Sequence, residues 1–377
     1  MTAAAIPPGA IALETIRIDP VNAGAINPGA INLLKNCAKL REGDHVVLAV
    51  ESPTLGYYNS DLCPSVLATA QSLGCRVTVI DTGFDPEARE IPDTILAQCA
   101  GADAVVFLSR LGDQLRFNAL PNETRTIQCY ALDAASLGSC FGTVPYSAMK
   151  ALRDATDRAF AEASEIRITC PNGTDVTGRA PRGFNPSDTT CLRFPLAVFS
   201  PIPAGAFSGR VALPGFLTGT GSRYYHPFTI DVPKGTFAQF EQGRLIGFSG
   251  PADGVRLANE HYDLVATRYD LDRNAIHSWH AGIHPGCKFD RDIQGAYEAW
   301  SGSAFGNPRI LHFHTCGALP PGEISWNVID ATIQVDGESL WERGVFQPHL
   351  VAGGSAIVQA TPELADKFAD PEQAIGF

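Results

Sequence analysis

Residues 45–81 read HVVLAVESPTLGYYNSDLCPSVLATAQSLGCRVTVID, two short apolar runs separated by a stretch of helical composition. The runs 45–50 and 76–81 are rich in β-branched residues, and each is long enough for one buried strand. The stretch between them ends at Gly74, where the C-terminus of a helix is expected. Strand, helix and strand at this spacing predict a parallel pair of strands covered by a helix.

The same alternation continues through the first half of the chain. Two further strands are predicted at 103–109 (DAVVFLS) and 126–132 (TIQCYAL), with helical stretches at 92–102 and 146–164. We therefore expect residues 1–165 to form an α/β domain, in which helices flank a parallel sheet. The segment LGYYNSD after the first strand lacks the glycine spacing of a dinucleotide-binding loop, so NAD is not expected.

From residue 165 the pattern changes to short strands separated by glycine and proline, beginning with EIRITCPNGTDVTG (165–178). Turn residues at this frequency predict a predominantly antiparallel β domain over 166–377. Eight of the nine histidines lie in this half, so we expect it to carry the active site.

Charge and composition narrow the class of partner. The net charge of −12 is spread along the chain, which argues against nucleic acid or an anionic membrane as the main partner and leaves a small uncharged or cationic molecule open. No run of about 20 apolar residues predicts a membrane span, and Pro7 and Pro8 interrupt a start that lacks a basic segment, so no signal peptide is expected. The ten cysteines form no CxxC pair and indicate reduced, mostly buried thiols in a cytoplasmic protein.

Two histidine segments could hold a metal. In ILHFHTCG (310–317), His312 and His314 alternate along an expected strand and would share one face, either as metal ligands or as a buried core pair. In HSWHAGIHPGC (277–287), His277 and His280 would be neighbours on a helix but would face opposite sides of a strand, and we favour His280 as the ligand. His284 falls in a Gly- and Pro-bounded turn, where it would cap the turn, face solvent or assist the site.

Other candidates lie outside these two segments. His226 in SRYYHPF (222–228) is either a general acid/base or a member of an aromatic cluster, and the neighbouring Tyr224 is a candidate substrate contact. Arg110 and Arg116 in SRLGDQLRF (109–117) would hold an anionic substrate across a domain cleft, or are ordinary surface arginines.

An ordered set of motifs resembles the aminopeptidase T-like metallopeptidase family, in particular its 2,5-dihydroxypyridine 5,6-dioxygenase-like branch. The motifs are RITCPNGTDVTG (167–178), GRLIGFSG (243–250), HAGIHPGC (280–287), LHFHTCG (311–317) and ATIQVDGESLWERGVF (331–346), within residues 40–347. The resemblance implies a homodimer. It also implies a metal site, which holds two ions and several glutamates in the peptidases, and one iron(II) with two histidines and an aspartate in the dioxygenases.

His280 occupies the position of a peptidase glutamate, which favours the dioxygenase branch. Both branches also carry a His-x-Asp pair before the closing hairpin, where this chain has Ser325 and Asn327. Three outcomes follow from this departure: His312 and His314 replace the pair, Glu323 supplies a carboxylate, or the metal has been lost.

The sequence therefore predicts a ring-cleaving dioxygenase of small hydroxylated (N-hetero)aromatic compounds, with iron(II) or another divalent metal as cofactor. The expected ligands are His280, His312 and His314, with His226 and His284 as catalytic groups and Arg110, Arg116 and Tyr224 as substrate contacts. One alternative is a metal-dependent amide or peptide hydrolase, with Asp292 or Glu298 as base or extra ligand. The other is a metal-free enzyme or binding protein on the same fold.

Overall fold

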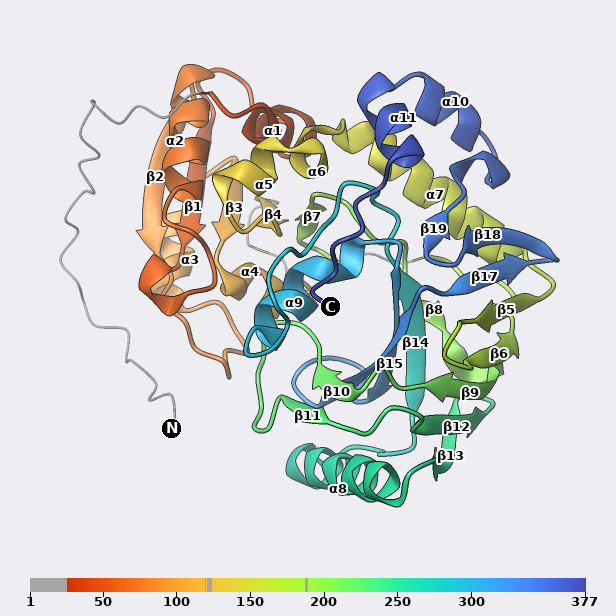
Figure 1. Ribbon diagram of the computed structural model, residues 1–377. Helices are drawn as coiled ribbons and strands as arrows, with labels where there is room; N and C mark the ends of the chain where they lie inside the picture. The colour runs from red at the N-terminus through yellow and green to blue at the C-terminus, as the bar shows by residue number, and fades with distance from the viewer. Residues whose placement is uncertain (1–25, 119, 121–123, 187–188) are drawn as a thin grey trace. The chain divides into compact units, whose positions relative to one another are not determined.

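The computed structural model describes residues 26–118, 120, 124–186 and 189–377 (Figure 1). The chain divides into two compact units, the first comprising Met1–Ser147 and Thr189–Pro195, the second Ala148–Asp188 and Leu196–Phe377. The division differs from a single boundary at 165 in two places. Residues 148–165 lie with the second unit, and 189–195 return to the first because strand β7 (Leu192–Phe194) pairs with β4 (Arg125–Cys129).

The first unit is built on a parallel sheet of five strands in the order β2-β1-β3-β4-β7, which confirms the expected α/β class. The remaining strands are β1 (His45–Val50), β2 (Arg76–Asp81) and β3 (Ala104–Leu108). Both faces of β1 are covered: Val47 and Ala49 belong to one apolar cluster with Ile95 and Cys99, and Val46 and Leu48 on the other face are also fully buried. Burial on both faces explains why β1 reads as a continuous apolar run.

Short helices surround this sheet. They are α1 (Pro28–Ile31), η2 (Asn32–Cys37), η3 (Pro53–Leu55), α2 (Leu62–Ser72), α3 (Asp93–Cys99), α4 (Arg110–Gln114), α5 (Ala134–Gly138) and α6 (Cys140–Thr143). Helix α7 (Tyr146–Glu162) begins at the end of this unit and belongs almost entirely to the second. Helix α2 lies against β1 and β2, as the strand–helix–strand pattern of 45–81 predicts.

The second unit contains two antiparallel sheets, which confirms the expected class of the second half. A six-stranded sheet has the order β11 (Thr229–Asp231), β10 (Phe216–Gly219), β16 (Glu323–Ile329), β15 (Ile310–Cys316), β14 (Ile276–Ala281) and β8 (Ile202–Pro203). An eight-stranded sheet has the order β13 (Arg244–Ser249), β12 (Phe237–Glu241), β9 (Ser208–Ala212), β6 (Asp175–Gly178), β5 (Ile166–Thr169), β17 (Thr332–Val335), β18 (Glu338–Glu342) and β19 (Val345–Phe346).

One face of the six-stranded sheet is an aromatic core. Trp279, Phe313 and Trp326, from the adjacent strands β14, β15 and β16, are fully buried, and the ring centroid of Phe240 in the eight-stranded sheet lies 5.8 Å from those of both Phe313 and Trp326. Side chains alternate along a strand, so His280 and the residues that flank Phe313 and Trp326 point to the opposite face. That opposite face is polar.

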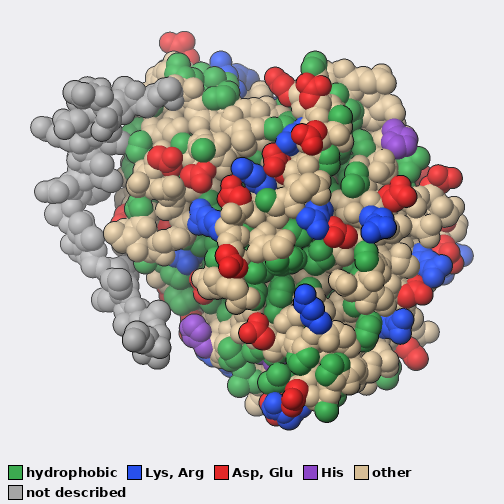
Figure 2. Space-filling model, in the orientation of Figure 1, with side chains coloured by type: hydrophobic (Ala, Val, Ile, Leu, Met, Phe, Trp, Pro, Cys, Tyr) green, Lys and Arg blue, Asp and Glu red, His purple; other side chains and the backbone are tan. Residues whose placement is uncertain are grey.

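The second unit also carries helices η5 (Ala204–Ala206), α8 (Ala252–Tyr269), α9 (Tyr297–Ser303), η6 (Ala304–Gly306), η7 (Pro348–Leu350), α10 (Gly354–Gln359) and α11 (Pro362–Ala369). Among the described residues, no helix is both long and apolar enough to cross a membrane. All ten cysteines are free thiols and most are buried. On the face drawn in Figure 2, acidic and basic side chains are interspersed, so the net negative charge forms no single patch there.

Helix α8 buries His261 beside Tyr225, with ring centroids 5.9 Å apart. Neither imidazole nitrogen has a hydrogen-bond partner in the described part of the chain, and burial lowers the pKa of His261 from 6.5 to about 4. Between pH 6.5 and pH 4 the unfolded chain binds more protons at this histidine than the folded chain does. The free energy of unfolding is therefore unaffected by His261 above pH 6.5 and decreases as pH falls towards 4.

We predict that His261→Leu removes up to about 3 kcal/mol of this acid-induced loss of stability. The variant should also be at least as stable as the wild type at neutral pH, because it buries no unpartnered nitrogen. Urea unfolding at several pH values measures both effects. A variant whose stability declines between pH 6.5 and 4 as steeply as that of the wild type would contradict this reading.

Candidate metal centre

Strand register brings three histidines together on the polar face of the six-stranded sheet. Strands β14 and β15 pair so that His280 lies opposite His312, and His314 follows two residues later on the same face. The Nε2 atoms of His280 and His312 are 2.7 Å apart. One ligand nitrogen from each of His280, His312 and His314 lies within 4.8 Å of the others, and this is the only such group of metal-ligating side chains found among the described residues.

A backbone contact orients His280. Its Nδ1 lies 3.0 Å from the carbonyl oxygen of Phe199, which can only accept, so Nδ1 carries the proton. Nε2 therefore holds a lone pair, directed towards His312. In metal-binding histidines, a hydrogen bond from the nitrogen that does not bind the metal fixes the tautomer in this way.

A carboxylate orients His314. Its Nδ1 contacts Oε1 of Glu323, and the other carboxylate oxygen accepts a hydrogen bond from the Thr220 hydroxyl. Glu323 is only 2% exposed, so water competes little for either contact. The Nε2 atom of His314 is buried and has no hydrogen-bond partner within the described ranges. An Nε2 atom without a partner, opposite an Nδ1 atom that contacts a carboxylate, is the arrangement found in metal-binding histidines.

An aromatic ring covers His312. The ring of Phe305 on η6 lies 4.0 Å from the His312 ring, centroid to centroid, at an interplanar angle of 31°. The adjacent chain can come this close because Gly282 has no side chain: a Cβ there would lie 2.2 Å from the carbonyl oxygen of Asn307. The glycine thus lets the end of β14 and the segment after η6 approach each other.

The three imidazoles fit a divalent transition metal. Imidazole nitrogen is a ligand for zinc, copper, iron and nickel, at about 2.0–2.1 Å for zinc. His280 and His314 each expose a lone pair on Nε2, by the hydrogen bonds just described. When no cation is bound, Nε2 of His312 carries a proton and donates a hydrogen bond to Nε2 of His280. If the proton is on Nδ1 of His312 instead, Nε2 has a lone pair that can bind a cation.

Ser325 and Asn327 lie directly beside these histidines. Strands β15 and β16 pair so that Ser325 is opposite His314 and Asn327 is opposite His312. Both side chains are fully buried, and the Ser325 hydroxyl donates to Oδ1 of Asn327 at 3.3 Å. Glu323 lies at the end of the same strand, where its carboxylate contacts His314 as a hydrogen-bond partner.

The other two histidines of 277–284 lie outside the group of three. His277 has Nε2 3.0 Å from the carbonyl oxygen of Cys316. His284 is fully buried, so of the alternatives open for it the solvent-facing one is wrong; its Nδ1 accepts the backbone N–H of Gly286 at 3.1 Å. The turn is packed inwards because the backbone N–H of His284 donates to the carbonyl of Gly306.

The remaining candidates of the second unit occupy separate positions. His226 is exposed in the loop between β10 and β11, and Tyr224 is buried with its ring 5.0 Å from that of Phe228. Asp292 is exposed and accepts the backbone N–H of Gln294 at 2.9 Å, and Glu298 lies in the first turn of α9. The roles expected for these residues stay predictions.

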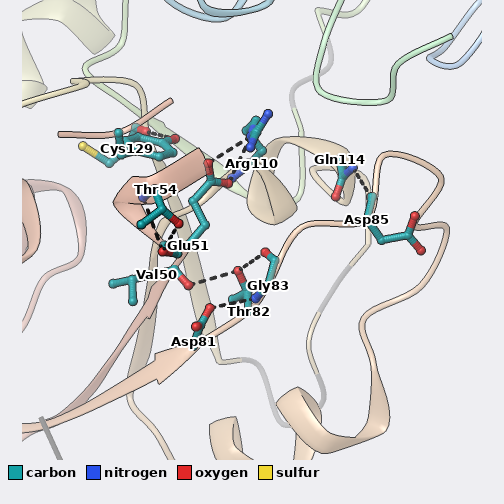
Figure 3. A network of polar contacts seen from close by, with 12 residues as sticks. Val50, Glu51, Thr54, Asp81, Thr82, Gly83, Asp85, Arg110, Gln114 and Cys129 are labelled. Carbon is teal, nitrogen blue, oxygen red and sulfur yellow. Dashed lines mark hydrogen bonds and ion pairs between the residues drawn. The ribbon is translucent and has the colours of Figure 1, made fainter. Parts of the chain in front are cut away.

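Arg110 belongs to a polar network in the first unit (Figure 3). Glu51 follows β1 and Arg110 follows β3, and the Nε atom of Arg110 lies 3.0 Å from Oε1 of Glu51 while its backbone N–H donates to Oε2 at 2.9 Å. The guanidinium also lies 3.5 Å above the ring of Phe84. This ion pair joins the ends of two adjacent strands.

Arg116 has a partner in the same unit. Its Nη1 atom lies 3.3 Å from Oδ2 of Asp113, three residues earlier. That Arg110 and Arg116 hold a substrate stays a prediction.

The sequence matches no protein-family model and no curated protein. A solved structure that is similar in fold is that of 2,5-dihydroxypyridine dioxygenase from Pseudomonas putida KT2440. The two share 13% sequence identity with a TM-score of 0.55, over 85% of this chain and 96% of that chain. At this identity the likeness establishes the fold alone. It agrees with the dioxygenase branch of the expected resemblance, and the wider peptidase family stays a prediction.

Glu323→Gln should weaken metal binding by about 10- to 100-fold, the usual cost of removing the hydrogen-bond partner of a ligating histidine. The amide keeps the size of the side chain but loses the charge that holds the Nδ1 proton of His314. Competition with a chelator measures the affinity. The matched control is Glu338→Gln on β18, which is exposed and should change nothing. Equal affinities for a folded Glu323→Gln protein and the wild type would show that Glu323 does not support the site.

Proposed function

We propose that this chain is a non-haem iron(II) enzyme, a ring-cleaving dioxygenase of small hydroxylated aromatic or N-heteroaromatic compounds, with His280, His312 and His314 as metal ligands. The proposal rests on the buried, unpartnered Nε2 of His314, as far as the chain is described, together with the two imidazoles beside it. The fold shared with 2,5-dihydroxypyridine dioxygenase supports the reaction class.

The protein's own groups have definable tasks in this reaction. An iron(II) ion held there supplies one-electron chemistry for dioxygen and a positive charge for a substrate oxygen. The Phe199 carbonyl and Glu323 hold the tautomers of His280 and His314, so that both present lone pairs to one point. Phe305 covers one side of His312 and excludes water from it. Three neutral imidazoles do not offset the positive charge of a bound ion. The site would therefore favour an anionic substrate.

Further assignments belong to the same proposal. His284 and His226 act as acid–base groups, Tyr224, Arg110 and Arg116 contact the substrate, and the protein is a cytoplasmic homodimer. His284→Ala should impair turnover more than metal loading, since His284 lies outside the group of three.

The reaction class is tested by oxygen uptake. Protein loaded with iron(II) under anoxic conditions should consume one dioxygen per ring cleaved when given hydroxylated pyridines, 2,5-dihydroxypyridine first among them. A chelator should abolish uptake and iron(II) should restore it. Full turnover by metal-free protein would contradict the proposal and favour the metal-free alternative.

The ligand set also favours one alternative, a zinc-dependent amide or peptide hydrolase. Three histidines with an open fourth position are a known ligand set for catalytic zinc, which activates water. Turnover of amide or peptide substrates at equal rates with and without oxygen would establish this function instead.

A further inference from the structure

Asn327 presents a buried amide with unused donors at the edge of the histidine group. Its side chain is fully buried and shares the polar face of the six-stranded sheet with His312, its partner in register. Oδ1 accepts the hydrogen bond of the Ser325 hydroxyl, which leaves Nδ2 as the other polar end of the amide. The Nδ2 atom has no hydrogen-bond partner in the part of the chain that the structure describes. Leaving such a group unpaired is costly, so a ligand that pairs with it gains affinity.

The chemistry of Asn327 limits what can pair with it. The Nδ2 atom offers two N–H donors, so its partner must bring a lone pair, which a metal cation cannot do. Glu323, the carboxylate on the same strand, already contacts His314 and Thr220 through its two oxygens. Because the described residues supply no acceptor for Nδ2, a bound molecule with an oxygen that accepts hydrogen bonds is the partner that fits it.

We infer that Asn327 is a substrate-recognising residue whose amide donates to a deprotonated phenolic oxygen of the bound substrate, beside His280, His312 and His314. This inference rests on the proposed function for the presence of a cation near the same oxygen. The substrate class then narrows to compounds that bind as phenolates or their N-heteroaromatic equivalents. In a compound with an amine in place of the hydroxyl, the N–H groups of the amine would face the N–H groups of the Asn327 amide, and the amide would stay unpaired.

The test uses 4-nitrophenol, whose phenolate is coloured, with 4-nitroaniline as the matched probe. Protein loaded with zinc(II), which is inert to redox chemistry, should bind 4-nitrophenol as its phenolate and lower the pKa of the bound phenol. Asn327→Leu should weaken that binding by about 10- to 100-fold, the range for a hydrogen bond to a charged group, and should raise the pKa of the bound phenol. Binding of 4-nitroaniline should be weak and equal in both proteins.

Two further variants complete the design. Asn327→Ser, a smaller polar replacement, should show the same loss and covers the case in which leucine prevents folding. Gln334→Leu, on β17 of the eight-stranded sheet, is the control and should match the wild type. Zinc content should be equal in all folded variants.

The outcomes separate this inference from the proposed function. If the wild type takes up no zinc, the proposed function fails, and the same titration on metal-free protein decides whether Asn327 still discriminates between the two probes. If zinc is bound and the Asn327 variants bind 4-nitrophenol as the wild type does, the inference is overturned. It is also overturned if the variants lose zinc, because Asn327 would then hold the metal.

Discussion

Replacing His280, His312 or His314 by alanine should abolish metal binding and oxygen uptake while the protein stays folded. Each variant removes one of three converging nitrogens, and His280 and His314 are the two whose lone pairs are set by Phe199 and Glu323. The loss of affinity should exceed the roughly 10- to 100-fold that follows removal of a ligand's hydrogen-bond partner. Chelator competition measures the affinity, and circular dichroism confirms the fold.

His277→Ala is the matched control for these variants. His277 lies on the same strand as His280, but it contacts the Cys316 carbonyl and lies outside the group of three. Its replacement should leave metal content and turnover at the wild-type level. Three alanine variants at 280, 312 and 314 that all keep full metal content would refute the site.

Arg110→Met should destabilise the first unit by about 3–5 kcal/mol, the usual cost of leaving a buried charge unpaired. Glu51 is buried, and burial raises the pKa of its carboxyl while Arg110 partly offsets that rise. Without Arg110 the pKa should rise further. When the pKa of a carboxyl is raised in the folded state, the free energy of unfolding decreases as pH rises through that pKa. The destabilisation caused by Arg110→Met should therefore be smaller in acid than at neutral pH. Urea unfolding at both pH values measures it.

A second substitution separates the charge effect from lost packing. Glu51→Gln combined with Arg110→Met removes both charges and should recover most of the stability. Arg167→Met breaks an exposed pair with Asp175 and should cost less than about 1 kcal/mol. Equal losses in Arg110→Met and Arg167→Met would show that the buried pair has no special role.

The sequence predicts the features that depend on local pattern. Strands β1, β3 and β4 follow from apolar runs, because strands buried on both faces need such runs. The shared face of His312 and His314 follows from their spacing of two residues along a strand. Strand β7 is not predictable in this way, because only three residues pair with β4 and they follow a long segment that belongs largely to the second unit.

The contacts that complete the candidate site depend on pairing over long distances in the sequence. His280 meets His312 through the register of β14 and β15, which no local pattern specifies. Phe305, Thr220 and the Phe199 carbonyl reach the histidines from segments that the sequence does not connect with them. Glu323 is identifiable as a nearby carboxylate, but its contact with His314 follows only from the packed sheet.

Elemental analysis of wild-type protein purified without oxygen tests the central claim most directly. We expect one iron per chain, bound by His280, His312 and His314 and retained through gel filtration. Active protein that contains no metal would contradict it.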